Sequence, residues 1–259
     1  MAKHLRDNVS RVKASSPLGT TIFVGLRVAD VLWQYTILHA GWGSKLIELL
    51  GGSSVDIDLV LDSSNGQLRP YYKLVIFMSL CSSLKQIVTL LFISKQEMPP
   101  ISAVIIAAAN TITNSLNSIM SLWLFTSRVP TSDRWFDILH SPSVAIGVGA
   151  YLVGLMTELI SELQRKAFKK NLANKGKPYG GGLFSLATNI NYGGYTLWRA
   201  GYALATGSLP WGILTFSFFF YDFSTRGVPV LDQYLTETYG EAWKEIKIRV
   251  KYRLFPRLY

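Results

Sequence analysis

Long apolar runs separated by short polar segments dominate the sequence. Six runs are each close to the roughly 20 residues that a helix needs to cross a bilayer. They cover residues 18–40, 72–94, 99–126, 142–162, 183–207 and 209–225. Residues 41–70 carry aspartates, glycines and serines and are expected to form a loop, with a short re-entrant or interfacial piece around KLIELLGG. The pattern predicts an all-α integral membrane bundle of about six transmembrane helices.

Basic residues gather at three places that flank these runs: KHLRDNVSRVK at 3–13, QRKAFKKNLANKGK at 164–177 and KEIKIRVKYRLFPRLY at 244–259. Cytosolic flanks of membrane helices are enriched in Lys and Arg, so all three are predicted to face the cytosol. Four spans between the first two segments and two more before the third satisfy this arrangement. We therefore expect cytosolic N- and C-termini, in the endoplasmic reticulum of a eukaryote or the cytoplasmic membrane of a bacterium.

Composition narrows the class further, with 49% hydrophobic and 16% charged residues and a formal charge of +10. The positive charge flanks the spans, so it needs no nucleic-acid partner. The single cysteine, Cys81, excludes an intramolecular disulfide, and three scattered histidines make a metal site unexpected. The first run lacks a small-residue cleavage site and is interpreted as a retained span. Without internal repeats, one compact bundle is the simplest organisation, and its oligomeric state is left open.

Polar side chains inside the predicted spans need a partner or a role. Arg27 and Asp30 share a helix face and either pair with each other or leave Asp30 facing a substrate cavity as a proton donor or carbonyl anchor. Lys85 would extend its amine toward an interface if it lies near one. Three amides lie on one face of the third span and predict either interhelical hydrogen bonds or a polar pocket wall. They are Asn110, Asn114 and Asn117.

The segment 157–185 brings charge and glycine together. Glu158 and Glu162 lie one turn apart at the end of a span, followed by four basic residues and a Gly-Gly-Gly turn that ends at Gly182. Cations beside a glycine turn that opens a helix would suit a phosphate group. The alternative is a flexible turn beside an ordinary cytosolic basic cluster. The four basic residues are Arg165, Lys166, Lys169 and Lys170.

Four motifs follow in order: GGLF at 181–184, NYGGY at 191–195, GYALATGSLP at 201–210 and LDQYLTETYGEAWKEIKIRVKYRLFPRLY at 231–259. From Glu162 onward the chain resembles the C-terminal domain of the steroid 5α-reductase family. The wider group with this domain includes isoprenylcysteine methyltransferases. The first 150 residues resemble the family only in having membrane spans.

The resemblance implies that residues 151–259 form an NADPH pocket and that residues 1–150 enclose a lipophilic substrate. It predicts an NADPH-dependent reductase of an activated C=C bond in a steroid, terpenoid or polyketide enone. Asp30 or Tyr35, chosen on chemistry and depth, would polarise the carbonyl. Lys169 and its basic neighbours favour NADPH over NADH. The expected cofactor contacts are Glu162, Lys169, Gly182, Asn191, Tyr192, Gly194 and Arg226.

Two acidic positions of the family pattern are absent, because Tyr195 and Trp198 stand there. Tyr195 would replace part of the lost function through its hydroxyl or act as a proton donor. Equally, the scaffold would suit a non-redox isomerase or cyclase that uses Tyr195, Glu158 or Asp30 as acid and base.

The methyltransferase branch typically carries Arg-His-Pro before the Asn-Tyr cluster, and here the corresponding residues are Thr188, Asn189 and Ile190. On this ground an S-adenosylmethionine-dependent methyltransferase ranks below a reductase. A catalytically silent scaffold or lipid-binding protein is the alternative outside enzymes.

Overall fold

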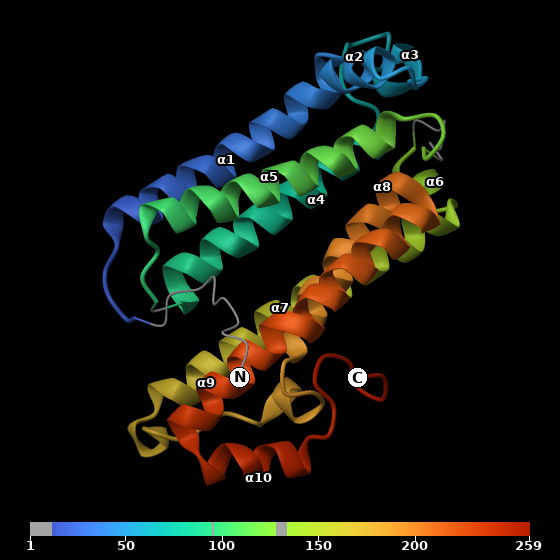
Figure 1. The fold of residues 1–259 in the computed structure, drawn as a ribbon. Coiled ribbons are helices and arrows are strands. Elements are labelled where there is room, and N and C mark those ends of the chain that lie inside the picture. The colour runs from blue at the N-terminus through green and yellow to red at the C-terminus, as the bar shows by residue number, and fades with distance from the viewer. Residues whose placement is uncertain (1–11, 95, 128–133) are drawn as a thin grey trace. The chain divides into compact units, whose positions relative to one another are not determined.

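The computed structural model describes residues 12–94, 96–127 and 134–259, and this part of the chain is almost entirely helical. Its only β structure is two isolated bridges, Ser54 with Trp123 and Leu61 with Leu68. The α-helices are α1 (Pro17–His39), α2 (Trp42–Leu49), α3 (Ile57–Val60), α4 (Pro70–Val88), α5 (Pro100–Leu122), α6 (Trp135–Ile138), α7 (Pro142–Lys170), α8 (Ile190–Asp222), α9 (Val228–Tyr239) and α10 (Glu241–Arg249) (Figure 1). The predicted all-α architecture is confirmed.

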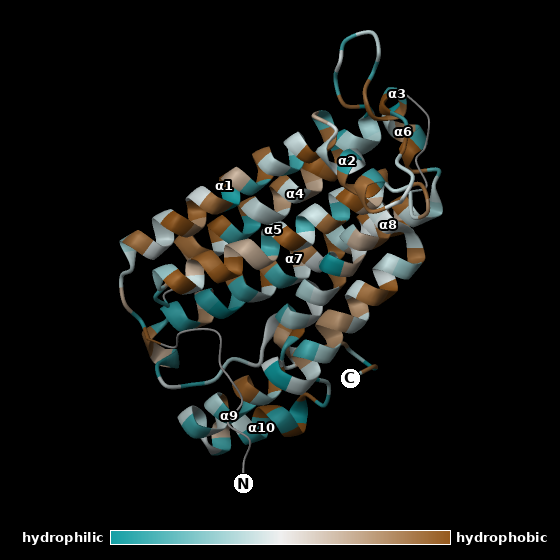
Figure 2. Ribbon diagram, turned by 45° about the horizontal axis from the view of Figure 1, so that its top comes forward, coloured by the Kyte–Doolittle hydropathy of each residue, from teal (hydrophilic) through white to brown (hydrophobic). Residues whose placement is uncertain are grey.

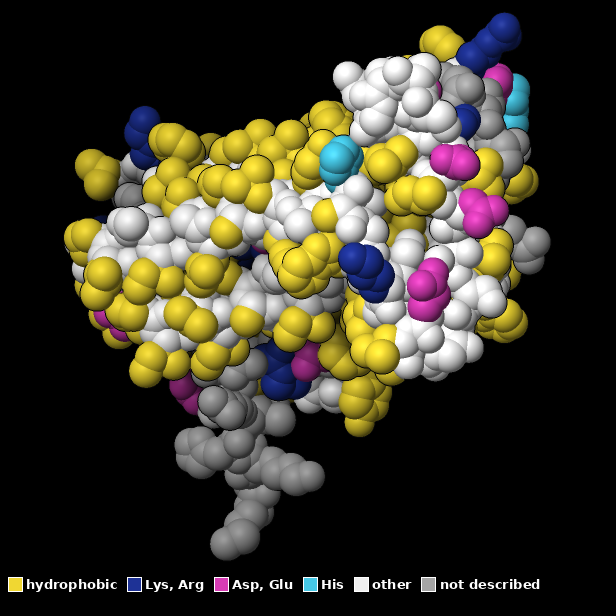
Figure 3. Space-filling model, turned by 90° about the horizontal axis from the view of Figure 1, so that it is seen from above, with side chains coloured by type: hydrophobic (Ala, Val, Ile, Leu, Met, Phe, Trp, Pro, Cys, Tyr) yellow, Lys and Arg dark blue, Asp and Glu magenta, His cyan; other side chains and the backbone are white. Residues whose placement is uncertain are grey.

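The chain is an integral membrane protein. Five helical regions are long and apolar enough to cross a bilayer: Pro17–His39, Pro70–Ile93, Pro100–Leu122, Pro142–Lys170 and Ile190–Tyr239. Apolar residues colour the long helices, whereas hydrophilic residues are prominent on α10 (Figure 2). In Figure 3 hydrophobic side chains are spread widely over the surface, among backbone and other side chains drawn in white, and few charged side chains are visible, as expected of a surface solvated by lipid.

Proline sets the start of four of the spanning helices. Pro17, Pro70, Pro100 and Pro142 are each the first residue of α1, α4, α5 and α7. Proline suits this position because its missing N–H would have no intrahelical acceptor there and its fixed φ is already helical. The sequence thus defines these boundaries to within two residues of the predicted starts at 18, 72, 99 and 142.

The chain divides into two units, and among the described residues the N-terminal unit comprises 12–150 together with Ala200–Leu214. In it α1 packs along α5 and α4. Phe23 meets Ala103 and Ala107 there, where small side chains let the helices approach closely. The segment predicted as a loop with an interfacial piece contains the short helices α2 and α3.

The C-terminal unit comprises Tyr151–Arg199 and Thr215–Tyr259. It holds parts of α7 and α8 together with α9, α10 and the tail that follows them. Two apolar clusters stabilise the polypeptide outside the long helices. The first is Phe184, Ala187 and Ile190, and the second is Trp243, Ile246 and Val250. The remaining short elements are the π-helical segments Thr89–Ile93 and Phe223–Gly227 and the 3₁₀ turns Leu172–Asn174 and Gly182–Ser185.

Helix α8 is not one straight rod but two antiparallel legs. Its backbone leaves helical geometry at Gly207 (φ −127°, ψ 20°) and Ser208 (φ 62°, ψ −172°), just before Pro210. A Cβ placed on Gly212 would lie 3.0 Å from the Cβ of Leu204, so the chain turns back on itself here. The two legs correspond to the separate spans predicted at 183–207 and 209–225, but the first leg starts only at Ile190.

Other boundaries were predicted wrongly. Helix α7 continues to Lys170, so Arg165 and Lys169 lie on its last turns rather than in a loop from 164. The glycine turn does not open a long helix, because Gly182 begins a short 3₁₀ turn and α8 starts only at Ile190. The proposed phosphate site at a helix N-terminus is therefore not formed there. The basic segment at 3–13 lies almost entirely outside the described residues.

Candidate functional site

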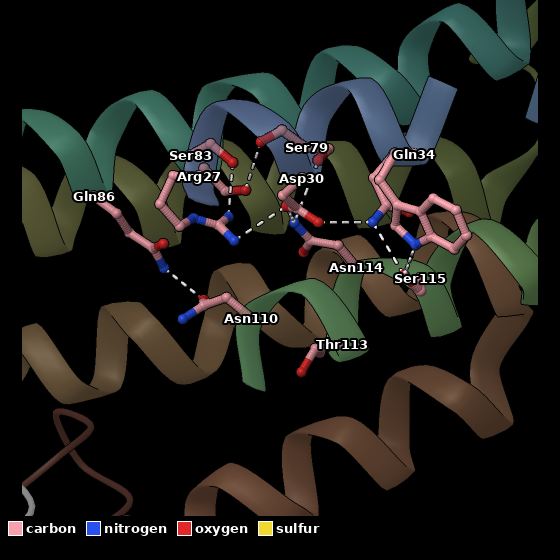
Figure 4. Close-up of polar contacts among 12 residues, drawn as sticks. Arg27, Asp30, Gln34, Ser79, Ser83, Gln86, Asn110, Thr113, Asn114 and Ser115 are labelled. Atoms are coloured by element: carbon pink, nitrogen blue, oxygen red, sulfur yellow. Dashed lines mark hydrogen bonds and ion pairs between the residues drawn. The ribbon is translucent and has the colours of Figure 1, made fainter. Parts of the chain in front are cut away.

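A buried polar cluster lies among α1, α4 and α5 in the N-terminal unit (Figure 4). Its centre is an ion pair in which Arg27 NH1 lies 3.1 Å from Asp30 Oδ2, both side chains being fully buried. Gln34 donates to Asp30 Oδ1 at 2.8 Å and Asn114 donates to Oδ2 at 2.7 Å. Arg27 also donates to Ser83 Oγ at 2.7 Å. The predicted ion pair is confirmed, and both oxygens of Asp30 already accept hydrogen bonds.

The asparagine seam on α5 connects three helices. Asn110 accepts from Gln86 of α4 at 2.7 Å, and Asn117 accepts from Trp211 Nε1 of α8 at 2.8 Å. This confirms interhelical hydrogen bonding as the role of the amides. Lys85 is buried within the N-terminal unit, so the condition for extending its amine to an interface is not met.

Tyr35 lies apart from this cluster. It is five positions after Asp30 in the sequence, which is about 140° around a helix. Its ring is 45% exposed and stacks on His39 with centroids 4.9 Å apart. The structure does not bring Asp30 and Tyr35 together as a pair of catalytic groups.

The C-terminal unit joins two of the predicted cofactor contacts directly. Asn191 Nδ2, at the start of α8, donates to Glu162 Oε1 of α7 at 2.8 Å. The other carboxylate oxygen of Glu162 accepts from Arg165, one turn further along α7. Asn191 is buried, and its carbonyl oxygen Oδ1 has no hydrogen-bond donor among the described residues. We call Glu162, Arg165 and Asn191 the amide–carboxylate cluster.

Two glycines next to Asn191 allow backbone to approach. A Cβ on Gly194 would lie 2.7 Å from the backbone nitrogen of Glu158, and one on Gly193 would lie 2.3 Å from the carbonyl oxygen of Leu254. Such distances would force backbone to move, so only glycine fits. The space that these glycines leave is filled by α7 and by the C-terminal tail, which supports helix packing as their role.

Aromatic rings surround the first turns of α8. Tyr192 stacks on Phe223 with ring centroids 4.6 Å apart and planes within 8° of parallel. Tyr195 makes edge contacts with Phe223 and Phe219. These four rings, which we call the aromatic group, lie beside the first turn of α8, where Asn191 is located.

A buried arginine completes this group. The guanidinium of Arg199 lies 4.2 Å from the ring centroid of Trp198, and its Nε donates to the Tyr195 hydroxyl at 3.1 Å. Trp198 in turn donates its Nε1–H to Glu158 at 2.7 Å. The predicted cofactor contacts did not include Arg199, although an arginine inside an apolar span is itself a sign of a functional or paired side chain.

Three other residues predicted to contact the cofactor interact with other parts of the C-terminal unit. Lys169 donates to the carbonyl of Lys177 and to the Tyr239 hydroxyl, both at 2.7 Å. Arg226 forms a bidentate pair with Asp222 at 2.7 and 2.5 Å. Gly182 adopts φ +52° in a turn whose next residue, Leu183, donates its backbone N–H to Gln164 Oε1 at 2.9 Å. None of these contacts joins them to the amide–carboxylate cluster.

Residues 102–250 match the model of a family described as "Protein of unknown function (DUF1295)". The chain belongs to this family. The matched region contains every residue of the amide–carboxylate cluster and the aromatic group, whereas Asp30 and Tyr35 precede it. The family region is thus the part of the molecule in which the candidate cofactor contacts lie.

A relative extends the similarity into the N-terminal spans. The chain is 37% identical over 235 residues to a protein named probable O-methyltransferase ustE from Ustilaginoidea virens. The aligned region covers 88% of this chain and 82% of the relative. The similarity is therefore not confined to the family region.

Proposed function

We propose that this protein is a membrane-embedded methyltransferase that moves a methyl group from S-adenosylmethionine to a hydroxyl group of a lipophilic small molecule. The observation that carries this proposal is the 37% identity along 88% of the chain to a protein named as a probable O-methyltransferase. It reverses the sequence-based ranking, which placed reduction first because the Arg-His-Pro of the methyltransferase branch is missing.

The amide–carboxylate cluster supports a cofactor of this chemistry. Asn191 Oδ1 is a buried acceptor without a donor among the described residues, a state that costs free energy until a ligand or water donates to it. The amino-acid end of S-adenosylmethionine carries an ammonium and a carboxylate, and Glu162 and Arg165 offer the two opposite charges. The residues present therefore fit the group without the missing Arg-His-Pro.

The aromatic group adds a second match. S-Adenosylmethionine supplies an electrophilic methyl group on a positively charged sulfur, and cations are favoured over aromatic faces. Tyr192, Tyr195 and Phe223 supply such faces beside the cluster. Transfer to a hydroxyl also releases a proton, which the Glu158 carboxylate would accept, directly or through water.

Reduction of an activated C=C bond with NADPH is the second candidate. The specific observation in its favour is that Glu162 and Asn191, both expected as NADPH contacts, bond to each other at 2.8 Å. The orphan oxygen of Asn191 would equally accept from a ribose hydroxyl or a carboxamide. Asp30 and Tyr35 remain proposals for the substrate side in this case.

Thermal unfolding of the detergent-purified protein tests both candidates. A ligand present at 100 times its dissociation constant stabilises by about 2.7 kcal/mol. For a chain of this size that raises Tm by roughly 5–10 °C. We expect S-adenosylmethionine and S-adenosylhomocysteine to raise Tm, and Asn191→Ala to abolish the effect. Asn65→Ala, in an exposed loop of the other unit, is the matched control.

The alternatives predict different results. A response to NADPH alone would replace methyl transfer with reduction. No response to any of these ligands, with Asn191→Ala folded like wild type, would contradict a cofactor site at the amide–carboxylate cluster. Incubation with methyl-labelled cofactor and a panel of phenols and polyketides then identifies the acceptor.

A further inference from the structure

The side chains of five exposed cations on the C-terminal unit make no ion pair, hydrogen bond or ring contact within the described residues. By contrast, Lys244 and Lys247 on the same unit pair with Glu241 and Asp232 at 3.2 and 3.0 Å. Unpaired charges of one sign repel each other and favour a partner of the opposite sign. We call these five residues the basic rim: Lys170, Lys175, Lys177, Lys251 and Arg257.

The end of α7 and the loop after it, which carry Lys170, Lys175 and Lys177, are held to α10 and α9 by direct contacts, and Lys251 and Arg257 lie on the tail that follows α10. Arg249 of α10 donates to the carbonyl of Gly180 at 3.1 Å. A Cβ on Gly180 would lie 2.8 Å from Ile246, so the loop lies directly on α10. Lys169, at the end of α7, donates to both the loop at Lys177 and α9 at Tyr239. The end of α7, the following loop and α10 therefore form one surface.

Large apolar side chains lie exposed among these cations. Leu172 is 86% exposed between Lys170 and Lys175, Ile248 is 70% exposed beside Lys247, and Leu258 is 70% exposed beside Arg257. All three lie outside the regions long and apolar enough to span a bilayer. Leucine and isoleucine between lysines are typical of segments that lie in the interfacial region, where the apolar groups reach acyl chains and the cations reach phosphates.

We propose that the basic rim, with Leu172, Ile248 and Leu258, is a docking surface for the headgroups of anionic phospholipids in the leaflet next to the C-terminal unit. The cations bind lipid phosphates and carboxylates, and the apolar side chains enter the upper acyl region. This surface would hold the loop that follows α7 and the tail against the membrane. It is independent of which cofactor the protein binds.

Titration of the full-length protein in mixed micelles tests this surface. Tm is measured while phosphatidylserine or phosphatidylcholine is added to dodecyl maltoside micelles, at about 50 mM and about 500 mM salt. We expect phosphatidylserine to raise Tm at low salt and phosphatidylcholine to raise it much less. Because a lysine near an anionic surface contributes roughly a fivefold gain in affinity, the variant K170Q/K175Q/K251Q should need at least tenfold more phosphatidylserine.

Matched variants separate this surface from general charge effects. K13Q/K45Q removes two exposed cations from the N-terminal unit and should leave the phosphatidylserine titration unchanged. L172S/I248S should weaken it at unchanged charge. Equal titrations for K170Q/K175Q/K251Q and wild type would overturn the proposal. So would equal stabilisation by soluble glycerophosphoserine, which lacks acyl chains. Tm in lipid-free micelles verifies that each variant is folded.

Discussion

The ion pair at the centre of the buried polar cluster should be especially sensitive to a single mutation, because both of its charges are buried away from solvent. Asp30→Asn removes the negative charge 3.1 Å from Arg27 while keeping the size of the side chain. Breaking a buried pair by removing one partner costs about 3–5 kcal/mol, since the remaining charge is left uncompensated. We therefore expect Asp30→Asn to lower Tm by roughly 6–20 °C.

Replacing both charges should cost much less. In R27M/D30L no buried charge remains, and such replacements are often neutral or stabilising. The neighbouring amides keep other partners: Gln34 still reaches Ser115 Oγ at 3.2 Å, and Asn114 reaches Ser79 Oγ at 3.3 Å. Tm of the double variant should therefore lie well above that of Asp30→Asn.

The assay is thermal unfolding of purified protein in one detergent, followed by intrinsic tryptophan fluorescence. Asp58→Asn, which changes an exposed carboxylate of the same unit, should stay within about 0.5 kcal/mol of wild type. Two results would refute this reasoning: a Tm for Asp30→Asn equal to that of Asp58→Asn, or a Tm for the double variant no higher than that of Asp30→Asn. Either would mean that an uncompensated buried charge is not the cause of the destabilisation. A stable Asp30→Asn variant without activity would instead favour Asp30 as a catalytic group.

Two further substitutions test packing in the C-terminal unit, each with its own control. Gly194→Ala would bring a Cβ within 2.7 Å of the backbone of Glu158 and should destabilise by about 1–3 kcal/mol, whereas Gly149→Ala meets nothing within 4 Å and should be neutral or stabilising. Leu254→Ala removes a fully buried side chain of the tail and should cost about 2–5 kcal/mol, whereas Leu258→Ala, at an exposed position, should change little. Unfolding curves check both pairs, and equal effects within a pair would contradict the packing described.

The positions of the spans could be predicted because the bilayer imposes a length and because proline defines helix starts. Pro70 and Pro142 each begin a helix within two residues of the predicted start. Helix ends were less predictable. The basic residues after 164 look like a loop by composition, yet an α-helix keeps its hydrogen bonds equally well in water. Lys169 and Lys170 thus extend α7 beyond the bilayer-length segment.

Polar side chains within the spans could be recognised, but their partners could not. Asp30 and Arg27 are three residues apart, and their pairing follows from helix geometry alone. The donors that complete the cluster, Gln34 and Asn114, depend on how α1 packs on α5, which no local pattern encodes. The same limit applies to Lys85, whose burial depends on its neighbours rather than on its distance from the end of a helix.

The C-terminal site shows how a missing motif residue changes the inference. Tyr195 and Trp198 stand where the resembling family has acids, and sequence alone suggested that a carboxylate function had been lost. In the structure two carboxylates approach the same helix from α7, with Glu158 bonded to Trp198 and Glu162 bonded to Asn191. Negative charge is therefore present beside α8 even though α8 itself does not carry the acidic residues of the family pattern.

Arg199, buried against Trp198 and bonded to Tyr195, adds a cation that the family pattern did not predict. Acids on one helix and an arginine–tyrosine pair on the next are the groups on which the proposed cofactor site rests, which is why replacing Asn191, the residue that joins the two helices, is the most direct test of function.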